Sequence, residues 1–228
     1  MSYNLLMIGD SNLFHASFPG GSCGSSYLDS ASVASMIRKR FKERRGDSVE
    51  YHPVHEFLKR PVFYPQYSCL LGQSAEVRLG EMKELMNQIS DDSVALIWLG
   101  QHDAWYMSKN MPGSLAKSCS CIEELAAKFS QRVNELDFAV VIYVSYFDHS
   151  SSSACSFYQE LSQALLAALL SNTCRSKLLD VGEFDDQCFV DLVHLGVTHK
   201  RRLSSRILDA LGAIMNEHMC SPALVVDT

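Results

Sequence analysis

The sequence predicts a three-layer α/β/α fold with a central, mostly parallel sheet of five strands. Short apolar runs recur near residues 5, 49, 94, 138 and 178, and each is followed by apolar residues at helical spacing. Parallel neighbours need crossover connections, which helices of this length supply. The chain has 228 residues and 47% hydrophobic content, enough for one substantial core and short for two. We therefore expect a single domain over residues 1–228.

The individual elements follow from local patterns. The first strand is predicted at Leu5–Ile8, because four apolar residues end abruptly at a Gly-Asp-Ser turn. A helix is expected to begin near Ser30 or Ser32, followed by a strand at 49–54 that Pro53 should stop. The later strands are expected at 93–99, 138–144 and 178–181, and the later helices at about 82–89, 121–136, 157–169 and 198–218.

Composition narrows the class of protein. The formal charge of -6 and a pI near 5.7 argue against bulk electrostatic binding to nucleic acid or anionic membranes. No apolar run reaches 18 residues, and no cationic segment precedes the first apolar run, so we expect neither a membrane span nor a signal peptide. We expect a cytoplasmic protein whose eight cysteines are reduced, and no cofactor or metal.

The opening turn places a hydroxyl where open α/β sheets bind ligands. Ser11 directly follows the first predicted strand, at its carboxyl end. An unassisted hydroxyl is too weak an acid to attack at neutral pH, so a nucleophilic serine needs a neighbouring base. The segment from Asp191 to His194 could supply a base and its orienting carboxylate, because the segments after the first and last strands open on the same edge.

Two further segments end short apolar runs in the same way. Gly72 follows Cys69-Leu70-Leu71, and a glycine there lets a backbone N–H approach a ligand, although an ordinary turn explains it equally well. The clearest buried strand, 93–99, runs directly into Gly100-Gln101-His102-Asp103. His102 is therefore a candidate site residue.

Taken together, these ordered blocks resemble the SGNH, or GDSL-type, hydrolase family, which has a flavodoxin-like fold. The resemblance implies that Ser11 is the nucleophile, His194 the general base and then acid, and Asp191 its partner. It also implies that the oxyanion hole contains the backbone N–H groups of Ser11 and Gly72. The family's third block reads Gly-x-Asn-Asp, with the asparagine as third donor, whereas this chain has His102 at that position. An imidazole can still donate a hydrogen bond, with different reach and charge.

The expected function is hydrolysis of carboxylic esters through an acyl-serine intermediate, with a small-molecule ester as partner. Small acyl groups such as acetyl are favoured because no long apolar run indicates a lipid tunnel. Carbohydrate acetyl esters, short-chain lipid esters and thioesters remain open, as does the oligomeric state. Asp10, Asn12 and Asp103 are expected to bind substrate.

Two alternatives compete with this interpretation. Esterase-like domains that resemble this family occur in retroelement and viral proteins beside nucleic-acid-binding regions, so the chain could be a binding module. The feature supporting nucleic-acid contact is a basic run formed by Arg38, Lys39, Arg40, Lys42, Arg44 and Arg45, although a solvated helix face explains it more simply. Ser22 lies in a G-x-S-x-G pattern, but a turn precedes it where a nucleophile elbow requires a strand.

Overall fold

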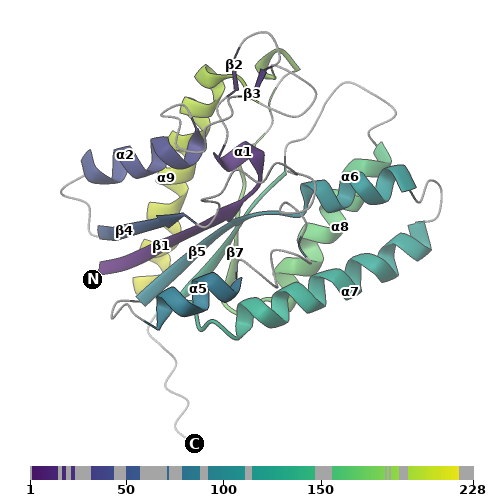
Figure 1. Ribbon diagram of the computed structural model, residues 1–228, viewed down its shortest axis with the longest axis horizontal. Coiled ribbons are helices and arrows are strands. Elements are labelled where there is room, and N and C mark those ends of the chain that lie inside the picture. Colours follow the sequence, from purple (N-terminus) through teal and green to yellow (C-terminus); the bar gives the residue numbers. More distant parts are fainter. Residues whose placement is uncertain are drawn as a thin grey trace, which may run out of the picture.

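A parallel sheet forms the centre of the computed structural model, which describes residues 2–14, 17–18, 22–23, 32–43, 50–56, 71, 79–87, 92–110, 115–146, 156–182, 184, 186–189 and 195–220. The sheet has the strand order β4-β1-β5-β6-β7, and every neighbouring pair is parallel (Figure 1). The α/β fold with a parallel sheet is thus confirmed. The strands are β1 (Ser2–Gly9), β4 (Glu50–Glu56), β5 (Asp92–Trp98), β6 (Val140–Val144) and β7 (Ser176–Leu179).

Helices cover both faces of the sheet (Figure 1). Residues of α2 and α9 share one apolar core with one face, and residues of α5, α6, α7 and α8 share a second core with the other. The helical elements are α1 (Ser11–Phe14), α2 (Val33–Glu43), α5 (Leu79–Met86), α6 (Gln101–Asn110), α7 (Leu115–Asn134), α8 (Ser156–Asn172), the 3-10 turn η2 (Asp186–Cys188) and α9 (Val197–Cys220).

The two cores explain why the strands read as unbroken apolar runs. In β1, Leu5 and Met7 belong to the core under α2 and α9, whereas Leu6 and Ile8 belong to the opposite core. Successive side chains of a strand point to opposite faces, and a parallel sheet covered on both faces buries both sets. The run of apolar residues therefore ends with the strand, at Gly9 and Asp10.

One strand boundary differs from the sequence prediction. Pro53 was expected to stop the second strand, but β4 continues through it to Glu56. β4 is the edge strand beside β1, so a residue without an N–H can be accommodated without breaking a central ladder. The pairing register also shifts between Tyr3 and Leu5, which is the kind of irregularity found beside edge prolines.

The sequence pattern also missed a helix. Only a polar cluster was expected after the strand at 93–99, yet the chain enters the ten-residue helix α6 there. Its buried side chains are Gln101, Asp103, Ala104 and Met107, and half of them are polar. The apolar residues of this segment therefore form too weak a stripe to predict a helix from the sequence. As a result, His102 lies in the first turn of a helix and not in a loop.

The strand order identifies where a ligand would bind. Numbered along the chain, the sheet strands follow the order 2-1-3-4-5, as in flavodoxin-like folds. The chain leaves β1 toward α2 on one face and leaves β5 toward α6 and α7 on the other. The carboxyl ends of β1 and β5 thus flank the topological switch point, where open α/β sheets hold ligands.

Gly100 provides a test of this framework. Its φ is +110°, and a Cβ built on it would collide with the hydroxyl oxygen of Tyr146. We expect Gly100→Ala to lower the free energy of unfolding by more than about 1 kcal/mol. Gly80→Ala is the matched control, because Gly80 lies in α5 and no atom of the described residues outside that helix's own backbone comes within 4 Å of the added methyl group. Alanine should therefore stabilise that helix by up to about 1 kcal/mol. Urea denaturation of the two variants measures both effects, and equal midpoints would contradict the prediction.

Candidate functional site

The turn after β1 is a capped helical turn. At Gly9, a Cβ would lie 2.7 Å from Leu13 Cδ2 and 3.2 Å from the Trp98 carbonyl oxygen, so only glycine fits without displacing its neighbours. Asp10 then caps α1, because the Asn12 backbone N–H donates to Asp10 Oδ1 at 2.8 Å. Ser11 is the first residue of α1, which places its backbone directly beyond the carboxyl end of β1.

The turn after β5 is held by a buried tyrosine. The Tyr146 hydroxyl donates to the Leu99 carbonyl oxygen at 2.6 Å, beside the left-handed Gly100. Burial raises the pKa of Tyr146 well above its usual range, and the nearby Asp103 carboxyl adds to that effect. Tyr146 therefore keeps its proton and remains a donor. α6 begins at the next residue, with His102 in its first turn.

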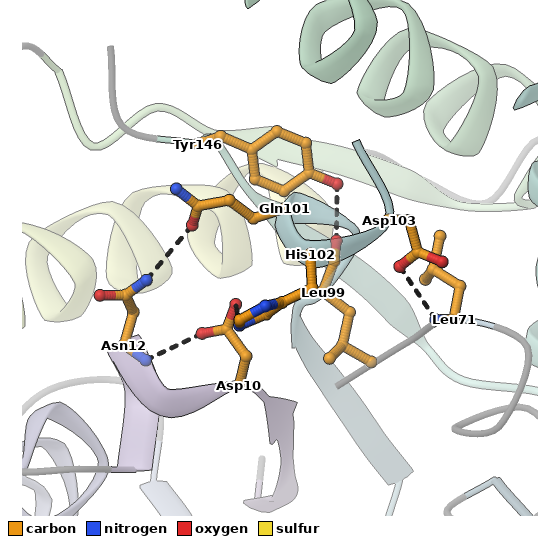
Figure 2. Close-up of polar contacts among 8 residues, drawn as sticks. All are labelled: Asp10, Asn12, Leu71, Leu99, Gln101, His102, Asp103 and Tyr146. Carbon is orange, nitrogen blue, oxygen red and sulfur yellow. Dashed lines mark hydrogen bonds and ion pairs between the residues drawn. The ribbon is translucent and has the colours of Figure 1, made fainter. Parts of the chain in front are cut away.

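Three contacts join the two turns across the switch point. The Asp10 backbone N–H donates to the Trp98 carbonyl oxygen at 3.3 Å. The Asn12 side-chain amide donates to Gln101 Oε1 at 3.2 Å, and His102 Nε2 lies 3.7 Å from Asp10 Oδ2. Figure 2 shows these side chains converging from α1 and from the start of α6.

Asp10 and His102 differ in their access to solvent. Asp10 is 1% exposed, whereas the His102 side chain is 38% exposed. Within the described part of the chain, Asp10 Oδ2 makes no hydrogen bond, and His102 is the ionisable group recorded beside it. A buried carboxylate is costly without a partner. The Nε2 atom of the imidazole therefore faces the Asp10 carboxylate, and the rest of the ring extends toward solvent.

A second buried carboxylate holds the segment that leads to Gly72. The Leu71 backbone N–H donates to Asp103 Oδ2 at 3.1 Å (Figure 2), and Leu71 itself is fully buried. Burial raises the pKa of Asp103 to about 7, and hydrogen bonds from the backbone N–H groups of Leu71 and of Asp103 itself limit the rise. Asp103 thus links α6 to the chain immediately before Gly72.

The segment that carries Asp191 and His194 is fixed at both ends. Phe189 and Leu195 form an antiparallel bridge, and the Gly196 N–H donates to the Cys188 carbonyl oxygen at 2.9 Å. Leu195 is fully buried in the same core as Leu13 of α1. Leu195, at the end of this segment, and the opening turn therefore share one apolar core.

The predicted site residues fall into two groups. The structure brings Asp10, Asn12, His102 and Asp103 together at the switch point and places the Ser11 backbone beside them. The Ser11 side chain, Gly72, Asp191 and His194 lie outside the described residues. Their catalytic roles stay predictions. Substrate contact by Asp10, Asn12 and Asp103 also stays a prediction, and the structure adds that all three are buried.

Sequence reasoning missed the residues that hold the site together. Gln101, Leu71 and Tyr146 each make a contact to a site segment, and none belongs to a recognisable motif. Gln101 carried the best available signal, because a polar side chain directly after a buried strand was already assigned to the site edge.

The structure describes only some of the residues on which the two alternative functions rest. Arg38, Lys39, Arg40 and Lys42 lie on α2, where Lys39 is exposed, while Arg44 and Arg45 lie outside the described residues. Ser22 belongs to the two-residue strand β3 (Ser22–Cys23), which pairs with β2 (Ser17–Phe18) in a separate antiparallel ladder.

The described residues also bear on metal binding, membrane insertion and thiol chemistry. Among the described residues, no group of three or more His, Cys, Asp or Glu side chains could hold a metal ion. No helix in the described ranges has the length and apolar character to cross a membrane. Cys121, Cys174 and Cys188 are free thiols.

No protein-family model and no curated protein sequence matches the chain. Solved structures do match. A lipase, Lip_vut3, from a goat rumen metagenome has 11% identity and a TM-score of 0.59, covering 92% of this chain and 97% of its own. A carbohydrate acetylesterase family member from Sinorhizobium meliloti has 14% identity and a TM-score of 0.55, covering 94% and 99%. LAE5, an alpha/beta hydrolase from the metagenome of Lake Arreo, has 14% identity and a TM-score of 0.54, covering 93% and 96%. These similarities show that the chain has the same overall fold as these proteins.

The raised pKa of Asp103 predicts a pH-dependent stability. Because its folded pKa of about 7 exceeds the ordinary value of 3.8, the folded state gains stability from this group at low pH and loses it as the pH rises through 7. Asp103→Asn has no charge to bury and keeps an oxygen for the Leu71 N–H. Relative to the original protein, the variant should become more stable between about pH 4 and pH 7, by up to a few kcal/mol at about 1.4 kcal/mol per pKa unit.

Urea denaturation across that pH range measures the trend. Asp103→Ala is the control, because it removes the acceptor of the Leu71 N–H and should destabilise the protein at every pH. A stability difference between Asp103→Asn and the original protein that stays constant from pH 4 to pH 8 would contradict the assignment.

Proposed function

We propose that this protein is a serine hydrolase that cleaves carboxylic esters through an acyl-Ser11 intermediate. The observation that carries the proposal is the geometry of the switch point. Ser11 begins α1 at the carboxyl end of β1, and the partly exposed ring of His102 lies across from it, tied to Asp10. Structures with this fold that match the chain include a lipase and a carbohydrate acetylesterase family member, which supports ester hydrolysis as the reaction class.

In the proposed reaction, Ser11 Oγ attacks the carbonyl carbon of the ester while His194 accepts the hydroxyl proton and Asp191 orients the imidazole. The carbonyl oxygen becomes an oxyanion that accepts hydrogen bonds from the Ser11 N–H, the Gly72 N–H and the His102 ring. Collapse of this intermediate breaks the ester C–O bond, and the alcohol leaves with the proton from His194. Water, deprotonated by His194, then releases the acid and restores Ser11.

Two structural features support the proposed roles of Asp191, His194 and Gly72, which lie outside the described residues. The Phe189–Leu195 bridge holds the ends of the segment that contains Asp191 and His194. The Asp103 side chain holds Leu71, which is bonded directly to Gly72. Leu195 and Leu71 are both fully buried, so each anchor holds the chain next to a residue that the proposed mechanism needs.

The first prediction concerns the nucleophile. Ser11→Ala should abolish hydrolysis of p-nitrophenyl acetate, because no acyl-enzyme can form without the hydroxyl. A fluorophosphonate probe should label the original protein on Ser11, located by peptide mapping, and should not label the variant. Ser22→Ala is the matched control, and it should keep both the hydrolysis of p-nitrophenyl acetate and the labelling by the probe.

Other labelling results would overturn the proposal in distinct ways. A label on Ser22 would move the nucleophile to that residue. Absence of any label, together with salt-sensitive RNA binding that is lost when Arg44 and Arg45 are neutralised, would instead indicate a binding module.

The second prediction concerns His102 as the third oxyanion donor. His102→Asn should keep or raise activity, because an amide also donates one hydrogen bond to the oxyanion. His102→Ala removes the donor and should lower kcat by about a hundredfold with little change in KM. A loss of more than about a hundredfold in His102→Asn would mean that the imidazole has a role that an amide cannot take.

The third prediction concerns Asp10 as a positioning residue that acts through His102. Asp10→Asn keeps the oxygen that caps α1 but removes the charge 3.7 Å from His102 Nε2. It should lower kcat by roughly 2- to 100-fold when His102 is present and should have no further effect in the His102→Asn background. Equal losses in both backgrounds would show that Asp10 serves only to cap the helix.

A further inference from the structure

The outer face of α6 carries two exposed aromatic side chains. Trp105 is 52% exposed and Tyr106 is 59% exposed. Within the described residues, the large hydrophobic side chains classed as exposed are these two and Leu178, which is 45% exposed on β7. Exposed aromatic groups gathered at one place are more informative than single apolar residues scattered over a surface.

Helical spacing aligns this aromatic pair with His102. Trp105 and Tyr106 are three and four residues beyond His102, so all three side chains lie on one face of α6. The buried Asp103, Ala104 and Met107 fix the opposite face against the protein. With a rise of about 1.5 Å per residue, the aromatic pair lies only about 4.5 to 6 Å along the helix axis from His102.

Polar groups accompany the rings at the same end of α6. Lys109 Nζ lies 6.0 Å from the centroid of the Trp105 ring. The helix end is held by side chains that cap its carbonyls: Ser108 Oγ donates to the Trp105 carbonyl oxygen at 2.7 Å, and Asn110 Nδ2 donates to the Tyr106 carbonyl oxygen at 2.7 Å. The aromatic pair therefore stands on a well-supported turn with a cationic donor beside it.

We propose that Trp105 and Tyr106 form a subsite for the alcohol part of the ester, and that this alcohol is a sugar ring. The inference rests on the proposed function, because it takes His102 to mark the reacting carbonyl. An ester bound there places its acyl carbon at the switch point. Its alcohol then extends one helical turn along α6, onto the rings.

The chemistry of this face favours a sugar over a linear alcohol. A pyranose has an apolar C–H face that stacks on an indole or phenol ring, and hydroxyl groups at its edge that accept hydrogen bonds. The Tyr106 hydroxyl and the Lys109 ammonium are donors suited to those hydroxyls. A short linear alcohol is too small to cover either ring and has no further hydroxyl for the cation.

The kinetic test compares two acetyl esters that differ in the alcohol. Trp105→Ala and Tyr106→Ala should each raise KM for 6-O-acetylglucose, which keeps its ring hydroxyls free, by about fivefold, with kcat little changed, since stacking binds the substrate without entering the chemical step. Neither should alter KM for ethyl acetate. Leu178→Ala is the matched control, because it removes an exposed apolar side chain from a different element.

A binding measurement separates this inference from the proposed function. The chain has two tryptophans, and Trp98 is fully buried, so Trp105 should dominate any ligand-induced change in fluorescence. Titration of the Ser11→Ala variant with 6-O-acetylglucose should give a saturable change. Adding Tyr106→Ala should raise the ligand concentration at half-saturation about fivefold. Adding Trp105→Phe should remove the fluorescence change.

The outcomes distinguish the two claims. If the protein hydrolyses both esters but the aromatic variants behave like Leu178→Ala, the subsite is refuted and the esterase stands. Equal rises in KM for both esters would also refute it. If the protein hydrolyses neither of these esters nor p-nitrophenyl acetate, the esterase proposal fails, and the fluorescence titration alone decides whether the aromatic pair binds a sugar.

Discussion

The pairing of β1 with β5 is the constraint on which the site depends. Their register sets Leu5 beside Val94 and Gly9 beside Trp98, so the two strands end together. The Asp10 N–H then donates to the Trp98 carbonyl oxygen, and the two following turns begin at the same level along the strand direction. A slip of one residue would exchange the buried faces of β1 and would also move Asp10 away from His102. The hydrophobic core thus fixes the polar geometry.

Buried and exposed groups have different structural roles at the carboxyl edge of the sheet. Asp10, Asn12 and Asp103 are nearly inaccessible, and their recorded contacts join one segment to another. His102 and the two aromatic residues that follow it on α6 are open to solvent. Because helix α6 carries members of both groups, its inner face is anchored to the sheet edge while its outer face is open to solvent. The buried contacts thus fix the position of the exposed side chains, as the proposed function requires of a site that is formed before substrate binds.

The parts of this architecture that sequence could predict are those set by long apolar patterns. The buried strands at the centre of the sheet and the long helices behind them follow from periodicity, and Ser32 caps α2 where a helix start was expected, through the Ser35 N–H at 3.1 Å. α6 was missed because buried Gln101 and Asp103 replace apolar residues on its inner face. The course of β4 through Pro53 depends on its being an edge strand, which is known only once the strand order is known. Contacts such as Asp103 to Leu71 join residues 32 positions apart, and no local pattern encodes them.

In the proposed mechanism, the histidine at position 102 would donate to the oxyanion differently from an asparagine. An amide donates from one nitrogen, and rotation about its terminal bond can aim that nitrogen freely. The imidazole has two nitrogens, and Nε2 already lies 3.7 Å from the Asp10 carboxylate. If a proton on Nε2 serves Asp10, an oxyanion contacted through Nδ1 requires a second proton on the ring. An asparagine at this position would donate to the oxyanion without that requirement, which is why the proposed mechanism expects His102→Asn to keep or raise activity. By the same reasoning, any effect of Asp10 on the reaction would act through the imidazole and would vanish when the imidazole is replaced.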